Sequence, residues 1–206
     1  HYNLGITYKE LGEYQKAISS YEKTIQIEPN YADRHYNLGL ILRELGEYQK
    51  AISSYQKAID IQPGYTGALN DLGIVFNEIG EHQKAIGCYE KVIQIDPNFV
   101  AAHNNLGIAL KELGEYKKAI SSCQKAIEID PNYASVHNNL GAIFNQLGKD
   151  QKAISYCQKA IEIDPNYSDA YWNLHSLASD IDEALDRLKK LQNINKKFLK
   201  AKIMIS

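Results

Sequence analysis

The sequence predicts an all-α protein of the α-solenoid class, built from stacked helix-turn-helix hairpins. Three sets of residues carry this prediction because they recur every 34 residues. The first set comprises the prolines Pro29, Pro63, Pro97, Pro131 and Pro165. The second set comprises Gly5, Gly39, Gly73, Gly107 and Gly141, and the third comprises Gly12, Gly46, Gly80, Gly114 and Gly148. A self-similar period of this length is typical of helical-repeat proteins.

Each 34-residue unit contains two predicted helices, and residues 32–65 illustrate them. The first helix is expected over about residues 32–45, and Gly46 ends it because glycine adopts a left-handed backbone without strain. The second helix is expected over about residues 48–61, where apolar residues recur with helical spacing. Pro63 follows and prevents its continuation. The two helices of a unit therefore form a hairpin.

One glycine recurs inside the first helix of each unit, at Gly39 in the second unit. A glycine in a helix interior costs about 1 kcal/mol relative to alanine. Its recurrence in five units implies a packing reason, so we expect the second helix to approach the first closely at this position.

The period divides a single array of residues 1–206 into successive units. The units are 1–31, which is incomplete at its start, then 32–65, 66–99, 100–133, 134–167, the divergent 168–198, and 199–206, the start of a seventh unit. Landmarks in the sixth unit lie 31 residues after their counterparts, which indicates a three-residue deletion between its helices.

These landmarks resemble the tetratricopeptide repeat (TPR) pattern, W-x2-L-G-x2-Y, then A-x3-F, then P. The second unit shows them as His35-x2-Leu38-Gly39-x2-Leu42, Ala51-x3-Tyr55 and Pro63. The Trp slot is the main departure and holds His1, His35, Leu69, His103, His137 and Tyr171. The resemblance implies a right-handed superhelix whose first helices line a concave groove.

Composition excludes several classes of partner. The formal net charge is −2, which argues against nucleic acid and against a polybasic membrane surface. Apolar runs fall short of the roughly 18 residues that span a bilayer. The odd, small number of cysteines, three, favours a reducing compartment, so we expect a cytoplasmic protein. The chain starts at His1 and its one methionine is Met204, which we interpret as a fragment or a processed product.

A row of amides in the first helices is the main candidate for binding. It lies two residues before each first-helix glycine, or before His175 in the sixth unit, and comprises Asn3, Asn37, Asp71, Asn105, Asn139 and Asn173. We call these residues the rungs. An asparagine amide offers both a donor and an acceptor, as a peptide backbone requires, so we expect the rungs to face the open groove. A similar asparagine ladder holds target polypeptides in the TPR region of O-GlcNAc transferases. The alternative is that the rungs serve helix structure.

Two further rows flank the rungs. The residues that directly precede them are Tyr2, Tyr36, Asn70, Asn104, Asn138 and Trp172, and the residues three places after them include Ile6, Leu40, Ile74 and Ile108. Apolar residues left uncovered would mark an interaction surface. The alternative is that the aliphatic residues pack against neighbouring helices. Further along, Arg43 and Glu78 belong to a mixed-charge edge that we interpret as solvated.

Other reactive residues are assigned structural roles. The recurring histidines lie on different units, too far apart for one metal site, and we expect them to pack in the Trp slot. Cys123 and Cys157 replace tyrosines Tyr55 and Tyr89 of other units and are expected in the core, whereas Cys88 is the expected exposed thiol. The sequence contains no recognisable catalytic set or phosphate loop, so no metal and no cofactor are predicted.

The sequence therefore predicts a non-catalytic scaffold that binds an extended segment of another protein or peptide in its concave groove. The alternative is the targeting or assembly arm of a larger enzyme of the glycosyltransferase, methyltransferase or sulfotransferase type. Self-association through the open ends of the array is a further expectation, because terminal repeats need polar caps.

Overall fold

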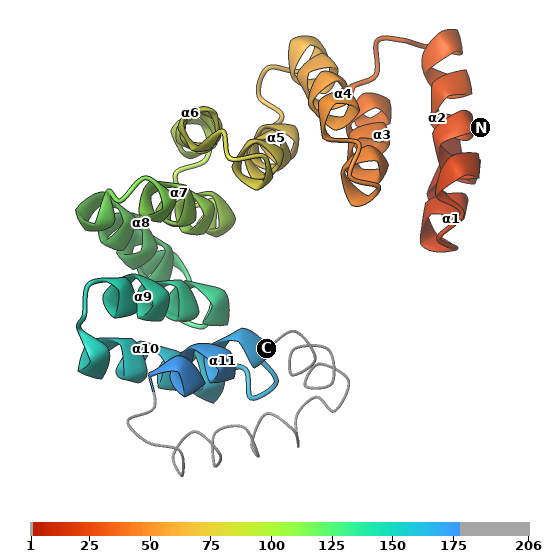
Figure 1. Ribbon diagram of the computed structural model, residues 1–206. Helices are drawn as coiled ribbons and strands as arrows, with labels where there is room; N and C mark the ends of the chain where they lie inside the picture. Colours follow the sequence, from red (N-terminus) through yellow and green to blue (C-terminus); the bar gives the residue numbers. More distant parts are fainter. Residues whose placement is uncertain (1, 178–206) are drawn as a thin grey trace. The chain divides into compact units, whose positions relative to one another are not determined.

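The computed structural model describes residues 2–177, and in this part the chain is helical without a strand (Figure 1). The helices are α1 (Tyr2–Glu10), α2 (Tyr14–Ile27), α3 (Ala32–Glu44), α4 (Tyr48–Ile61), α5 (Thr66–Glu78), α6 (His82–Ile95), α7 (Val100–Glu112), α8 (Tyr116–Ile129), α9 (Ala134–Gln146), α10 (Asp150–Ile163) and α11 (Ser168–Ser176). The predicted α-solenoid class is confirmed, since successive helices pair as hairpins. His1, the predicted second helix of unit 168–198 and the seventh unit lie outside the described residues.

The chain divides into two compact units, residues 1–102 and residues 103–206, with the boundary inside α7. In the first unit, α1 pairs with α2, α3 with α4 and α5 with α6, while α2 also packs on α3 and α4 on α5. In the second unit, α9 pairs with α10, while α8 packs on α9 and α10 on α11. In three of these pairs the second helix, which is α2, α4 or α10, therefore also contacts the first helix that follows it.

The hairpin turn is built by a glycine in the left-handed region. Gly46 has a φ of +73°, and its N–H donates to the carbonyl of Arg43 at 2.9 Å. The next N–H, of Glu47, donates to the carbonyl of Leu42 at 2.8 Å. This pair of hydrogen bonds is the Schellman arrangement, which satisfies carbonyls that the helix end would leave unpaired. The equivalent glycines of the other hairpins have the same φ sign.

The linkers between hairpins carry a second recurring turn. In the later units an aspartate before the proline accepts the N–H of the asparagine after it, as Asp130 does from Asn132 at 2.9 Å. The same contact joins Asp164 to Asn166 at 2.9 Å. Asp side chains favour such local turns because the carboxylate reaches the backbone two residues on. Proline and aspartate together therefore end one hairpin and start the next.

The glycine inside the first helix is confirmed as a close-approach position. A Cβ built on Gly39 would lie 2.6 Å from a ring carbon of Tyr55, a fully buried residue of α4. In the fourth unit the tyrosine is replaced by Cys123, and a Cβ on Gly107 would lie 2.5 Å from its Sγ and 3.3 Å from the carbonyl oxygen of Ala119. The smaller side chain therefore brings no spare room, and glycine is still required.

The cysteine predictions are confirmed for two residues and wrong for the third. Cys123 and Cys157 are fully buried, as expected. Cys88 was expected to be the exposed thiol, but it is buried too and packs with Leu42 and Leu72. The reason is that this position faces a first helix, since its equivalents Ser20 and Ser54 are also buried. Burial raises the pKa of the Cys88 thiol to about 11.

Candidate functional site

Neighbouring first helices are joined by polar contacts that share one spacing. In each contact the two partners lie 35 residues apart, which is one repeat and one residue. The joined pairs are Tyr2 with Asn37, Tyr36 with Asp71, Asn104 with Asn139, and Asn138 with Asn173. Four of the six rungs, namely Asn37, Asp71, Asn139 and Asn173, are therefore linked to the residue that precedes the rung of the repeat before them.

Three of these links have the same direction, with the rung as the donor. Nδ2 of Asn139 donates to Oδ1 of Asn104 at 2.8 Å, and Nδ2 of Asn173 donates to Oδ1 of Asn138 at 2.7 Å. Asn37 donates to the hydroxyl of Tyr2 at 3.0 Å and also to the carbonyl of Asp33 at 2.8 Å. The N–H groups of these three rungs therefore hold neighbouring first helices together, which is a structural role like the alternative raised for them, and their role in ligand binding stays a prediction.

The Asp71 rung reverses the direction. Aspartate has no hydrogen to donate when ionised, and here the hydroxyl of Tyr36 donates to its Oδ2 at 2.8 Å. Nδ2 of Asn70 donates to the other oxygen, Oδ1, at 3.2 Å. Burial is the main cause that raises the pKa of Asp71, while these two donors and Arg43 act in the opposite direction.

The row before the rungs is less accessible than the sequence suggested. Asn70, Asn104 and Asn138 were expected on the groove surface, but all three are buried. Tyr2, Tyr36 and Trp172 are half-buried, as are all the rungs from Asn37 to Asn173, whereas Asn3 is exposed. The asparagines of this row therefore act as acceptors or donors within the stack and offer little area to a ligand.

Three asparagine rungs keep an unused acceptor. The contacts of Asn37, Asn139 and Asn173 use Nδ2, and no residue of the described chain donates to their Oδ1 atoms. Asn139 and Asn173 each use one of two amide hydrogens in these bonds. These three rungs thus combine a structural donor with an acceptor that has no donor within the described chain.

An aromatic and acidic cluster in the first unit was missed by the sequence reasoning. The rings of Tyr36 and Tyr65 lie 5.0 Å apart, and the hydroxyl of Tyr65 donates to Oδ1 of Asp33 at 2.7 Å. Burial, followed by the two aspartates, raises the pKa of both tyrosines above the ordinary value. The available signal in the sequence was weak. Tyr65 and Tyr31 occupy the same linker position in successive repeats, and Asp33 lies two residues after Tyr31.

The aliphatic row is partly packed against neighbouring helices and partly exposed. Ile6, Leu40, Ile74 and Ile108 are all half-buried. Ile6 packs against the cluster of Ala17, Tyr21 and Ile41, and Leu40 packs against the cluster around Tyr55. Packing against neighbouring helices therefore accounts for part of this row, and a ligand role for the remaining exposed area stays a prediction.

The mixed-charge edge contains one well-formed ion pair between repeats. Nη2 of Arg43 lies 2.7 Å from Oε1 of Glu78, and Nε of Arg43 also donates to both carboxylate oxygens. These residues, like the ladder partners, lie 35 residues apart. The sequence analysis expected this edge to be solvated. The ion pair shows that it also links α3 to α5.

The histidines occupy the packing role predicted for them. His35, His103 and His137 are buried. Nε2 of His35 lies 2.9 Å from the carbonyl oxygen of Pro29, and Nε2 of His137 lies 3.0 Å from that of Pro131. Each ring thus ties a first helix to the preceding proline linker. Across residues 2–177 no three His, Cys, Asp or Glu side chains gather as metal ligands would.

The stack of hairpins, its proline linkers and its buried glycine contacts define a helical-repeat protein of the TPR type. Family models described as tetratricopeptide repeat match residues 1–31, 31–98, 100–133 and 134–167, which together make up most of the chain. The chain therefore belongs to the tetratricopeptide repeat family. Among the described helices, none has the length and apolar character needed to cross a membrane.

Solved structures with the same fold include the protein MamA, at 26% identity and a TM-score of 0.71 over 79% of this chain and 95% of that chain. PilF of Pseudomonas aeruginosa gives a TM-score of 0.78 at 20% identity, covering 98% of this chain and 93% of that chain. YrrB, described as a TPR protein with an unusual peptide-binding site, gives 0.61 at 22% identity, covering 87% and 94%. No curated protein sequence matched.

Proposed function

We propose that this protein is a non-catalytic scaffold that binds an extended polypeptide segment along its first helices. The rungs supply hydrogen bonds to the peptide backbone, and Tyr2, Tyr36 and Trp172 supply aromatic contact area. The observation that carries the proposal is the row of unused Oδ1 acceptors on Asn37, Asn139 and Asn173. Rungs that contact only the backbone of a peptide bind peptides of many sequences. The ladder therefore gives affinity, while the aromatic residues give selectivity.

The bonds within the ladder add to the binding role. An amide whose Nδ2 is held by the preceding repeat has its Oδ1 fixed in direction, as for Asn139 on Asn104. Such a group loses little rotamer freedom when a ligand binds, and preorganisation of this kind improves affinity. The structural role of the rung and its proposed ligand role therefore support each other.

The structural relatives agree with this proposal at the level of the family. MamA and PilF show the same hairpin stack, and the description of YrrB includes a peptide-binding site. The alternative, a targeting arm of a larger enzyme, would use the same groove and stays a prediction that the full reading frame would test. The self-association, cytoplasmic location and ladder resemblance to O-GlcNAc transferases also stay predictions.

A random-peptide phage library tests the proposal directly. We expect the chain to enrich extended peptides, and Asn139→Ala with Asn173→Ala to weaken their binding. Each lost neutral hydrogen bond contributes about 0.5–1.5 kcal/mol, so the pair should cost about 1–3 kcal/mol, or roughly 5- to 150-fold in affinity. The loss should be similar for peptides of different sequence.

Asn104→Ala is the matched control, because it removes the partner of Asn139 from a buried position while leaving Oδ1 of the rung in place. Equal losses of affinity in Asn104→Ala and Asn139→Ala would assign the ladder to the stack alone. Failure to enrich any peptide would overturn the proposed function.

A further inference from the structure

Two tyrosine rings and two carboxylates meet where α3 and α5 lie side by side in the first compact unit. The rings of Tyr36 and Tyr65 lie 5.0 Å apart, and each hydroxyl donates to an aspartate. The acceptor is Asp71 for Tyr36, at 2.8 Å, and Asp33 for Tyr65, at 2.7 Å. We call these four residues the tyrosine–aspartate cluster. Because Tyr36 and the rung Asp71 belong to the proposed peptide groove, the cluster is a part of that groove.

The two carboxylates of the cluster have no cationic partner within the described chain. Neither Asp33 nor Asp71 forms an ion pair across residues 2–177. Arg43, whose charge acts on Asp71, is already paired with Glu78 at 2.7 Å. Arg34, the sequence neighbour of Asp33, also pairs with a glutamate. The hydrogen bonds to the two aspartates come from neutral groups, namely tyrosine hydroxyls and an asparagine amide.

The helical stack does not require a carboxylate at position 71. Between α7 and α9 the equivalent link joins Asn139 to Asn104 at 2.8 Å, so an amide performs the same structural role. Burial is the main cause that raises the pKa of Asp71, so the ionised side chain opposes folding. A cation bound beside it would offset this effect, because an opposite charge favours the ionised form.

A fully buried hydroxyl behind the cluster has no hydrogen-bond partner. It belongs to Tyr55, and no residue of the described chain bonds to it. The ring of Tyr55 lies 6.0 Å from that of Tyr36. Burial, followed by the charge of Asp71, raises the pKa of Tyr55, so the hydroxyl lies close to that carboxylate. Unsatisfied buried groups in native proteins call for an explanation, and a polar ligand group beside Asp71 supplies one.

A glycine keeps the ring pair open on the side of α5. Gly67 is the equivalent of Asp33 one repeat later. A Cβ built on Gly67 would lie 3.3 Å from a ring carbon of Tyr65 and 3.7 Å from the hydroxyl oxygen of Tyr36. A longer side chain at this position would therefore cover both rings. With glycine there, the two rings stay half-buried and Asp33 is exposed.

We propose, on the basis of the peptide groove proposed above, that the tyrosine–aspartate cluster takes a cationic side chain of the bound polypeptide, with arginine preferred to lysine. A guanidinium donates two parallel N–H groups to a carboxylate and stacks on an aromatic ring. The cluster offers both kinds of contact, whereas Asn104 and Asn139 at the equivalent positions of α7 and α9 offer neither a charge nor a ring. The rungs thus hold the backbone of the peptide, and the cluster selects a basic residue.

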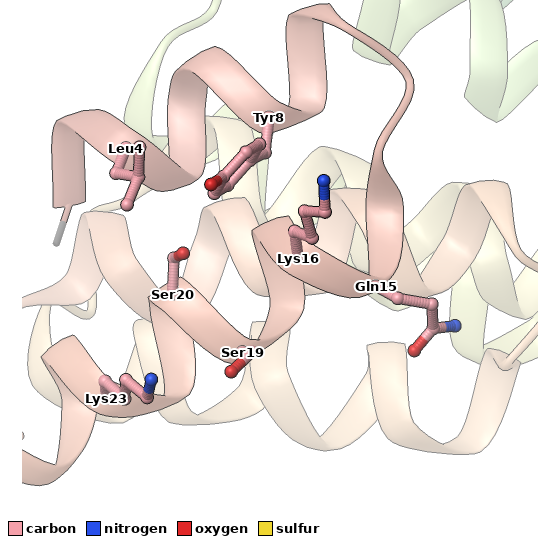
Figure 2. Close-up of a pocket in the computed structure, with 7 residues that line it drawn as sticks. All are labelled: Leu4, Tyr8, Gln15, Lys16, Ser19, Ser20 and Lys23. Atoms are coloured by element: carbon pink, nitrogen blue, oxygen red, sulfur yellow. The ribbon is translucent and has the colours of Figure 1, made fainter.

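Two hollows elsewhere in the first unit have a different chemistry. One of about 390 Å³ in the first hairpin is lined by Lys16 and Lys23 and by no carboxylate (Figure 2). The other, of about 600 Å³, is lined by residues of α2, α3 and α4 and includes Glu22 and Glu47 beside Lys50. Glu22→Gln with Glu47→Gln is therefore the matched control, because it removes two negative charges of the same unit outside the cluster.

Selection from a random-peptide phage library, with the bound peptides sequenced, tests the proposal. Peptides enriched on the parent chain should contain an excess of arginine, and a smaller excess of lysine, at one position. Asp33→Asn with Asp71→Asn should still enrich peptides but lose this excess, and the glutamate control should keep it. Enriched peptides without an excess of basic residues would overturn the cationic subsite and leave the groove standing. Failure to enrich any peptide would overturn the groove itself.

The most strongly enriched peptide then serves as a fluorescein-labelled probe for anisotropy titration. Replacement of its arginine by citrulline removes the charge and keeps the shape, and should weaken binding to the parent chain by about ten-fold. The same replacement should have little effect on binding to Asp33→Asn with Asp71→Asn. Thermal melts verify that this variant folds, and Asp33→Asn alone changes an exposed residue and should show part of the effect. Equal losses on the parent and the double variant would overturn the proposed pairing.

Discussion

The hydroxyl of Tyr36 donates to Oδ2 of Asp71 at 2.8 Å, whereas the rungs Asn37, Asn139 and Asn173 are themselves the donors. The exchange of a donor for an acceptor at position 71 is compensated by a hydroxyl at position 36. Tyr2 shows that the same residue type also serves as an acceptor, since Asn37 donates to it. Tyrosine before the rung therefore accommodates either an amide or a carboxylate in the next repeat.

The first prediction concerns the charge of Asp71. Burial raises its pKa in the folded state above the ordinary value of 3.8, so ionisation disfavours folding. This penalty is missing below the ordinary pKa and develops as the pH rises through the folded-state pKa. We therefore expect Asp71→Asn to raise the free energy of unfolding at pH 7 and to have a smaller effect at pH 3. Urea denaturation across this pH range measures the difference.

Asp60→Asn is the control for this experiment, because Asp60 is exposed on α4. It should show little change with pH beyond that of the parent chain. An Asp71→Asn variant that loses stability at pH 7 would show that the bonds from Tyr36 and Asn70 outweigh the burial of the carboxylate.

The second prediction concerns close approach at Gly107. Gly107→Val places atoms against Sγ of Cys123 and the carbonyl of Ala119, which lie 2.5 and 3.3 Å from a Cβ there. Overpacking of this kind costs about 1–3 kcal/mol. A thermal melt of the variant should show the loss, and a melt identical to that of the parent would contradict the proposed contact.

Gly87 offers the opposite case and is the third prediction. It lies inside α6, and a Cβ built on it meets nothing within 4 Å. Gly87→Ala should therefore stabilise the protein by about 0.5–1 kcal/mol through the helix preference of alanine. Chemical denaturation of the single variants should give changes of opposite sign at Gly87 and Gly107, and a shared sign would refute the distinction.

The fourth prediction concerns the stack. Asn139→Ala removes the donor to Asn104 and leaves Oδ1 of that buried residue without it. An unsatisfied buried polar group costs about 1–3 kcal/mol, so this variant should unfold at lower urea concentration. Asn139→Ala with Asn104→Ala should recover part of the loss, because both partners are then gone. Additive losses would show that the two residues do not interact.

The fifth prediction concerns thiol reactivity. All three cysteines are buried, and burial raises the pKa of Cys88 to about 11 and that of Cys123 to about 12. Thiolates are the reactive form, so the folded protein should react with a disulfide reagent such as DTNB at pH 8 far more slowly than the denatured protein. Rapid labelling of one thiol in the folded state would show that Cys88 is accessible after all.

The fold was predictable from the sequence because its signals are local and repeated. Gly46 ends a helix through its own backbone, and Pro63 blocks the next turn, so neither needs distant partners to be interpreted. The packing of Gly39 on Tyr55 was predictable as well, since both recur with one period. Such features depend on residues within one hairpin.

The candidate site was less predictable because it depends on the offset between hairpins. The sequence aligns residues at a spacing of 34, but the side chains that meet across the ladder are 35 apart. An alignment of the repeats matches Asn104 with Asn70 and Asn138, not with Asn139. The burial of Asn104 and its hydrogen bond with Asn139 could therefore not be predicted from the repeat pattern. Cys88 was misjudged for the same reason, since its cover comes from a first helix and not from its sequence neighbours.

The 35-residue link has a consequence for how such an array gains and loses units during evolution. Excision of residues 32–65 would bring Asp71 against Tyr2, the same residue type as its present partner Tyr36. Excision of residues 134–167 would bring Asn173 against Asn104, again the same type as its present partner Asn138. Recombination that removes either of these periods therefore preserves the pair of residue types that meet at the new junction, so the array can shorten there without losing the hydrogen bond between neighbouring first helices.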